Sequence, residues 1–163
     1  MERFIFAALL VVALSLSGTG ADPQCLPGWS SSDGYCYKVF KEYKRWDDAE
    51  MFCRQEVEGG HLVSIHSKTE AKFLARLVFR KFILLNVWIG LSSPGKHGIW
   101  RWSDGSSFYY TSWAFGEPNN FLWNEYCVGL MSITGHRKWS DQNCRSKRYF
   151  ICKAQPQSEG STW

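Results

Sequence analysis

The sequence predicts an α+β domain, with helices in its first half and short strands in its second half. Two segments of the first half place apolar residues at three- and four-residue steps, as amphipathic helices do. From residue 87 on, aromatic and β-branched residues form short runs that turn residues interrupt. All six cysteines follow a secretory-type N-terminus, and an even number of cysteines in a secreted chain favours disulfides.

The N-terminus has the pattern of a secretory signal peptide. Arg3 precedes an apolar run over residues 4–16, and small residues occupy 17–21. The apolar run is too short to span a bilayer. Cleavage after Ala21 fits the small-residue rule, and cleavage after Gly20 is a close alternative. We therefore expect a signal peptide at 1–21, one domain at 22–153, a flexible tail at 154–163, and a secreted protein that does not span a membrane.

The net charge of +4 decides little about partners. Its densest cluster, at positions 72, 76, 80 and 81, has the spacing of one solvated helix face. No exposed aromatic pattern accompanies it, so we expect no nucleic-acid partner.

The first half contains a hairpin and two helices. Residues 25–29 and 35–40 form two short expected strands around a turn at 31–34. A helix is expected between Arg45 and Glu56, ended by Gly59 and Gly60. Ser67 and Glu70 have the spacing of a capping box, so a second helix starts there and runs to about Phe82.

The second half consists of strands and one long loop. The expected strands cover residues 87–91, 99–102, 127–133, 137–139 and 149–153. The segment 103–126 has little periodicity, and a loop of this length in a compact domain is usually functional. The tryptophans at 88, 100, 102 and 139 are interpreted as core residues rather than sugar-stacking residues.

The long loop carries the candidate functional residues. Glu117 and Asn119 flank Pro118, and a cis bond before the proline could turn both side-chain oxygens toward one point. Glu125 lies just before Cys127, and Asp141 lies just before Cys144. Carboxylate and amide oxygens from three segments suit calcium, so we expect a calcium site there.

These motifs resemble the C-type lectin-like domain family. The resemblance rests on Trp88-Ile89-Gly90-Leu91, the six cysteines in this order, Glu117-Pro118-Asn119, and Trp139-x-Asp141. It covers about residues 25–153, and the signal peptide resembles those of snake venom C-type lectins. The family implies two helices flanking two small antiparallel sheets with a long calcium- and sugar-binding loop. It also implies the disulfides Cys25–Cys36, Cys53–Cys152 and Cys127–Cys144, which cysteine spacing alone does not select from fifteen pairings.

The resemblance also implies a ligand. In the family, the side chains that match Glu117, Asn119, Glu125 and Asp141 hold the calcium that binds the sugar. Together with Pro118 they form the expected sugar site. Glu-Pro-Asn is the family's mannose-type signature, so the expected ligands are mannose, fucose or N-acetylglucosamine residues on glycoproteins or glycolipids. The expected activity is calcium-dependent lectin binding, with cell agglutination and effects on prey haemostasis as its consequences in venom.

Ser140 departs from the family pattern, which has an asparagine at this position. A serine hydroxyl is shorter than an asparagine amide and offers one donor instead of two. We expect this position to weaken the site. A second calcium is not expected, because Asn120 and Tyr126 stand where the family has acidic residues.

Two other functions compete with the lectin function. Glu117 and Glu125 could mimic the carboxylate pair of a glycosidase, but no cleft is indicated, so no enzyme activity is expected. The stronger rival is a venom C-type lectin-like protein with a degenerate sugar site that binds clotting factors or platelet receptors. Such chains usually carry an extra cysteine in the long loop, which is absent between Cys53 and Cys127. A non-covalent homodimer stays open.

Overall fold

The computed structural model describes residues 23–158. The expected signal peptide, and residues 159–163 of the expected tail, lie outside the described residues. Two helices, two 3₁₀ turns and eight strands follow one another within these residues. They are β1 (Ser30–Ser32), β2 (Tyr35–Lys44), α1 (Trp46–Glu56), β3 (His61–Leu62), α2 (Lys68–Arg80), β4 (Val87–Ser92), β5 (Arg101–Trp102), η1 (Phe121–Trp123), β6 (Cys127–Leu130), η2 (Ser132–Thr134), β7 (Trp139–Gln142) and β8 (Arg148–Ala154).

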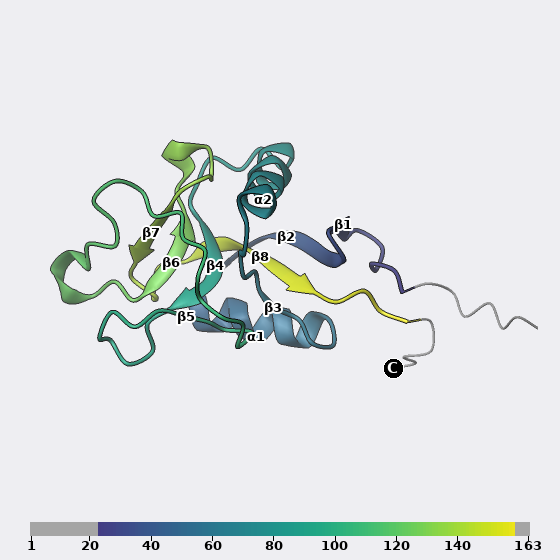
Figure 1. Cartoon of the computed structure of the whole chain (residues 1–163), viewed down its shortest axis with the longest axis horizontal. Helices are drawn as coiled ribbons and strands as arrows, with labels where there is room; N and C mark the ends of the chain where they lie inside the picture. The colour runs from purple at the N-terminus through teal and green to yellow at the C-terminus, as the bar shows by residue number, and fades with distance from the viewer. Residues whose placement is uncertain (1–22, 159–163) are drawn as a thin grey trace, which may run out of the picture.

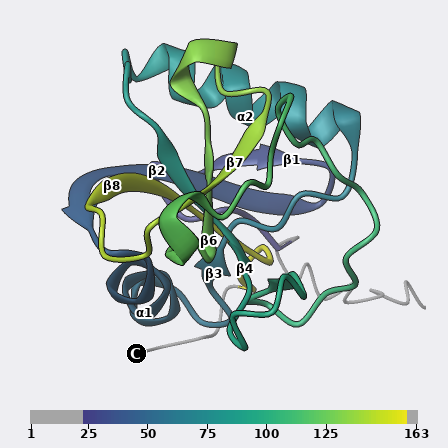
Figure 2. The same ribbon diagram turned by 90° about the vertical axis from the view of Figure 1, so that its left-hand side faces the viewer.

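The sheet runs through the middle of the molecule in the order β1-β2-β8-β4-β6-β7, with β3 paired to β8 and β5 to β4. All neighbouring strands are antiparallel except β4 and β8, which pair in parallel. This pair joins the two expected small sheets into one. Figures 1 and 2 show α1 and α2 on opposite sides of the sheet. The α+β fold class and the two flanking helices are confirmed.

Alternation along the central strands divides the core between the two helices. In β4, Val87, Ile89 and Leu91 pack in the cluster that includes the inner face of α2, whereas Trp88 packs with α1. In β8, Ile151 packs toward α2 and Phe150 toward α1 in the same way. Successive side chains of a strand point to opposite faces, so a sheet between two helices needs apolar residues at nearly every position. Both strands are accordingly almost fully buried.

The expected helix signals are confirmed, with small differences at the ends. The Glu70 amide donates to Ser67 Oγ at 3.1 Å, as the capping box predicts. The Glu70 carboxylate accepts from the His66 amide instead of the Ser67 amide. The helix α2 ends at Arg80, two residues before the expected end, and Phe82 adopts a left-handed conformation with φ 54°. A left-handed residue cannot continue a right-handed helix.

Two expected strands lie at shifted positions, and two others, 99–102 and 127–133, are shortened to β5 and β6. The first hairpin strand, β1, is Ser30–Ser32 rather than 25–29, because the turn consists of Asp33 and Gly34, which both have positive φ. Asp-Gly is a preferred pair for such a two-residue turn. The strand β7 begins at Trp139, where the expected strand ended, and therefore includes Ser140 and Asp141.

The three disulfides link Cys25 to Cys36, Cys53 to Cys152, and Cys127 to Cys144. This confirms the pairing that the family resemblance implied. The last strand continues to Ala154, and Gln157 exchanges two backbone hydrogen bonds with Gln24, at 3.0 and 2.9 Å. Paired backbone therefore extends beyond residue 153, the last residue of the expected domain.

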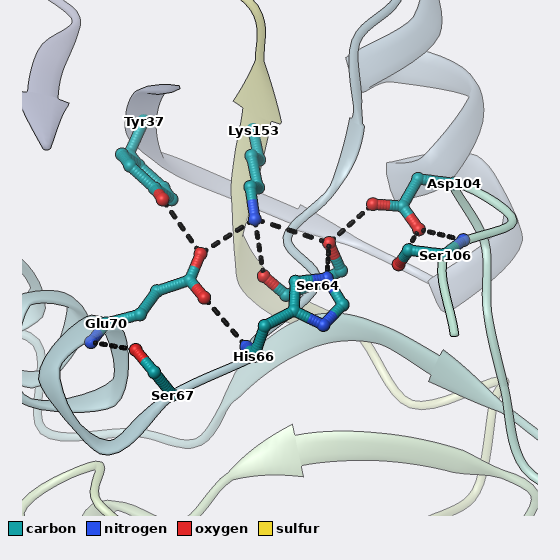
Figure 3. A network of polar contacts seen from close by, with 8 residues as sticks. All are labelled: Tyr37, Ser64, His66, Ser67, Glu70, Asp104, Ser106 and Lys153. Carbon is teal, nitrogen blue, oxygen red and sulfur yellow. Dashed lines mark hydrogen bonds and ion pairs between the residues drawn. The ribbon is translucent and has the colours of Figure 1, made fainter. Parts of the chain in front are cut away.

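A buried polar network fixes the start of the long loop to the core (Figure 3). Lys153 on β8 donates to Glu70 of α2 at 2.7 Å and to the Ser64 carbonyl at 3.1 Å. The Ser64 hydroxyl donates to Asp104, which follows β5 at the beginning of segment 103–126. Burial acts to raise the pKa of Asp104, but hydrogen bonds from Ser106 and Ser64 lower it overall. Asp104 is thus held as an anion at the base of the loop.

Candidate calcium and sugar site

A backbone hydrogen bond to β7 and a turn within the loop position the candidate site. The Ala114 amide donates to the Trp139 carbonyl at 2.9 Å, and the Glu117 amide then closes a turn on the Ala114 carbonyl at 3.0 Å. The Glu117–Pro118 bond is cis, as the sequence allowed. These contacts bring the Glu-Pro-Asn segment alongside β7, the strand that carries Asp141.

Asp141 is the buried anchor of the site, with only 2% of its surface exposed. Its two carboxylate oxygens accept from the backbone amides of Asn119, at 3.0 Å, and Asn120, at 2.7 Å. A carboxylate from the sheet therefore fixes the backbone of the loop just after the proline. Charge-assisted bonds of this kind are the stronger hydrogen bonds in proteins.

Glu117, Asn119 and Glu125 lie around this anchor. Asn119 Nδ2 donates to Glu117 Oε1 at 2.9 Å, and Asn119 Oδ1 accepts from the Phe121 amide at 2.9 Å. The Phe121 amide also donates to Glu125 Oε2 at 3.0 Å. Hydrogen bonds to the Asn119 side chain and to the backbone amides of residues 119–121 thus connect all four expected calcium-binding side chains.

The electrostatics of this group favour a cation. Burial, the adjacent carboxylate of Asp141 and the charge of Glu125 raise the pKa of Glu117 to about 7. Burial and the charge of Asp141 also raise the pKa of Glu125, although the Phe121 amide acts in the opposite direction. Glu117 Oε2 is buried and receives no hydrogen bond. A bound cation would neutralise the crowded carboxylates and give this oxygen a partner.

The donor set fits calcium better than a transition metal. Calcium takes carboxylate and amide oxygens and accepts irregular coordination, whereas zinc prefers histidine and cysteine. Within residues 23–158, no three His, Cys, Asp or Glu side chains lie close enough together to hold a metal ion. Both Asp141 oxygens, Glu117 Oε1 and Glu125 Oε2 accept hydrogen bonds from backbone or amide donors, whereas Glu117 Oε2 accepts none. Glu117, Asn119, Glu125 and Asp141 are the residues that would hold the ion.

Ser140 is close in sequence but is not part of this group. Its Oγ accepts from Gln142 Nε2 at 3.0 Å, and Gln142 Oε1 accepts from Arg148 Nε at 2.8 Å. Because alternate residues of a strand share a face, Ser140 lies with Gln142, and Asp141 lies on the other face. Ser140 therefore points away from the calcium-binding side chains and hydrogen-bonds with Gln142, which in turn binds Arg148.

The sequence reasoning did not identify two features of the site. Asn120 accepts from the Glu125 amide at 3.0 Å and adopts a left-handed conformation, which asparagine tolerates well. It therefore links the two glutamate segments. In addition, large apolar side chains are exposed next to the site, namely Phe115, Phe121, Leu122 and Trp123. Their position outside any periodic run was the signal available in the sequence.

Comparison with known proteins identifies the class. The Lectin C-type domain model matches residues 42–154, so the chain belongs to the C-type lectin domain family. Members of this family are non-enzymatic carbohydrate-binding proteins, which confirms the expectation that the chain is not an enzyme. None of the helices between residues 23 and 158 has the length and hydrophobicity of a transmembrane span.

Individual relatives narrow the class to snake lectins. The chain is 99% identical over 163 residues, 100% of both chains, to C-type lectin lectoxin-Lio1 of Erythrolamprus poecilogyrus. It is 49% identical over 160 residues to snaclec agglucetin subunit alpha-1 of Deinagkistrodon acutus, covering 96% of this chain and 100% of that one. Among solved structures, human lithostathine superposes with a TM-score of 0.76 at 39% identity, covering 80% of this chain and 99% of that one. The resemblance to snake venom C-type lectins is thus confirmed.

Proposed function

We propose that this chain is a secreted, calcium-dependent lectin of mannose-type specificity. The observation that supports this most strongly is the joining of Glu117, Asn119 and Glu125 to the buried Asp141. These are four of the five positions at which the family pattern has calcium-binding side chains, the fifth being Ser140 here. We place one calcium ion among them, and it supplies positive charge and open coordination positions for two neighbouring sugar hydroxyls.

The side chains themselves can recognise a vicinal diol. A carboxylate such as Glu117 or Glu125 accepts a hydroxyl proton, and the Asn119 amide donates to a hydroxyl oxygen. Each charge-assisted bond contributes about 1.5–3 kcal/mol at best, and less in an open site. A single shallow site therefore binds weakly, and agglutination of cells requires at least a non-covalent dimer that presents two sites.

The test is retention on mannose-agarose in calcium, followed by elution with a chelator. The paired substitution Glu117→Gln with Asn119→Asp converts the tripeptide to the galactose-type signature and should move retention from a mannose column to a galactose column. Glu58→Gln, in the exposed turn after α1, is the control and should elute like the wild type. Flow-through of the wild type from mannose-agarose in calcium would contradict the lectin function.

A protein-binding role is the second candidate, and two observations favour it. Ser140 is turned away from the calcium ligands, and the apolar side chains of Phe115, Phe121 and Trp123 are exposed beside them. One relative of similar length is a snaclec subunit. Binding of clotting factors or platelets that persists in a chelator, together with flow-through from the mannose column, would select this function.

A further inference from the structure

The outer face of α2 carries a line of like charges. Lys68, Lys72, Arg76 and Arg80 follow one another at four-residue intervals and are all exposed. Like charges at this spacing lie on one side of a helix and repel one another. The helix has one acidic residue, Glu70, whose carboxylate is bound to the buried Lys153. The repulsion along α2 is therefore not relieved within the helix.

A second basic segment lies beside this helix. Figure 2 shows η2 next to α2, and Arg137 and Lys138 follow η2 before β7 begins. Their backbone is held in place, because the Arg137 carbonyl accepts from Ser112 Oγ at 2.9 Å and the Lys138 carbonyl accepts from the Met131 amide at 2.8 Å. Arg137 and Lys138 line hollows that residues of α2 also line.

Two adjoining hollows separate the helix from this segment, with volumes of about 610 and 350 Å³. Both are lined by Lys72 and Arg137. Arg76 adds to the first, and Lys68 and Lys138 add to the second. No carboxylate lines either hollow. The ion pairs found among residues 23–158 involve other cations. We call the surface formed by Lys68, Lys72, Arg76, Arg137 and Lys138 the basic groove.

We propose that the basic groove binds a sulfated polysaccharide. Arginine and lysine donate charge-assisted hydrogen bonds to oxyanions, and a linear chain with regularly spaced sulfates can contact both hollows at once. A flat anionic bilayer would touch the protruding side chains without entering the hollows. Single-stranded nucleic acid is bound largely by stacking on several exposed aromatic side chains, and among the lining side chains only Phe79 is an exposed aromatic one. The groove shares no residue with the calcium site, so the inference does not depend on the proposed lectin function.

The test measures the affinity of the full mature protein for a heparin decasaccharide by calorimetry. EDTA is present to silence the calcium site, and ionic strength is held at about 0.15 M, where long-range attraction is screened. We expect Lys72→Gln with Arg137→Gln to weaken binding about 5- to 30-fold, as expected for two lost surface charge contacts. Lys41→Gln with Arg54→Gln removes the same charge from exposed positions elsewhere and should change affinity less than about twofold.

Several results would overturn the inference. These are no binding by the wild type, equal weakening by the two double variants, or equal affinity for fully desulfated heparin. Tighter binding of poly-glutamate or of anionic vesicles than of heparin would also reject a sulfated polysaccharide as the occupant. Both variants should retain wild-type thermal unfolding and mannose-agarose behaviour. Loss of mannose binding with intact heparin binding would reject the proposed lectin function alone.

Discussion

Competition between protons and calcium at Glu117 gives the sharpest prediction. In the metal-free protein, burial and the nearby carboxylates of Asp141 and Glu125 raise the pKa of Glu117 to about 7. Calcium requires the ionised carboxylate, so binding must displace the proton when the pH is below this value. The apparent calcium affinity should therefore fall as the pH is lowered.

The size of the effect follows from the pKa. A group with a pKa of about 7 reduces apparent affinity about 1.1-fold at pH 8, about 11-fold at pH 6 and about 100-fold at pH 5. A glutamate with an ordinary pKa would reduce it less than about 1.5-fold at pH 5. Calcium binding at pH 6 should also release about 0.9 proton, but only about 0.1 proton at pH 8.

Calorimetry in two buffers of different ionisation enthalpy measures both quantities. Glu117→Gln should abolish the proton release, and Glu58→Gln should leave it unchanged. An affinity that is constant between pH 8 and 6, without proton release at pH 6, would refute the proposed crowding of carboxylates. The folding stability of the metal-free protein should change with pH in the opposite direction to the calcium affinity. Folded Glu117 binds protons more tightly than unfolded Glu117, so the stability contributed by this group falls as the pH rises from about 4.5 to about 7.

Three further predictions concern calcium, Ser140 and the buried network. Calcium at 100 times its dissociation constant should stabilise the fold by about 2.7 kcal/mol, and EDTA should reverse this in thermal unfolding; Asp141→Asn should remove most of the response. Ser140→Asn should leave calcium and mannose affinity unchanged in calorimetry, because Ser140 bonds Gln142 on the face of β7 opposite Asp141, and a gain of about 1 kcal/mol would instead place this position in the ligand set. Lys153→Met should destabilise the protein by about 3–5 kcal/mol in urea unfolding, because Glu70 would stay buried without its cation. The exposed Lys41→Met should cost less than about 0.5 kcal/mol, and an equally small effect at Lys153 would refute the role of the network.

The helices and the disulfide pairs were predictable to different degrees. The periodicity and the Ser67 cap located both helices from local sequence alone. The pairing of Cys53 with Cys152 is not a local property, because 99 residues separate them. Only the family resemblance implied it before the structure brought α1 and β8 together.

The shift of β7 shows where local patterns failed. Residues 140–142 are polar, and no period-2 apolar pattern marks them as a strand. They are nonetheless buried, because β7 pairs with β6 and its polar side chains bind the loop and Arg148. Burial of polar residues with satisfied hydrogen bonds is a tertiary effect that composition does not reveal.

The sequence by itself predicted the fold class, a disulfide-bonded domain and the four oxygen-bearing side chains of the candidate site. The tertiary structure alone decided how these side chains are joined, because the Asp141 bonds to the Asn119 and Asn120 amides connect residues more than twenty positions apart. It also turned Ser140 toward Gln142, and it brought Arg137 and Lys138 next to the basic face of α2. Each of these depends on contacts between distant segments, which only packing of the whole domain can fix.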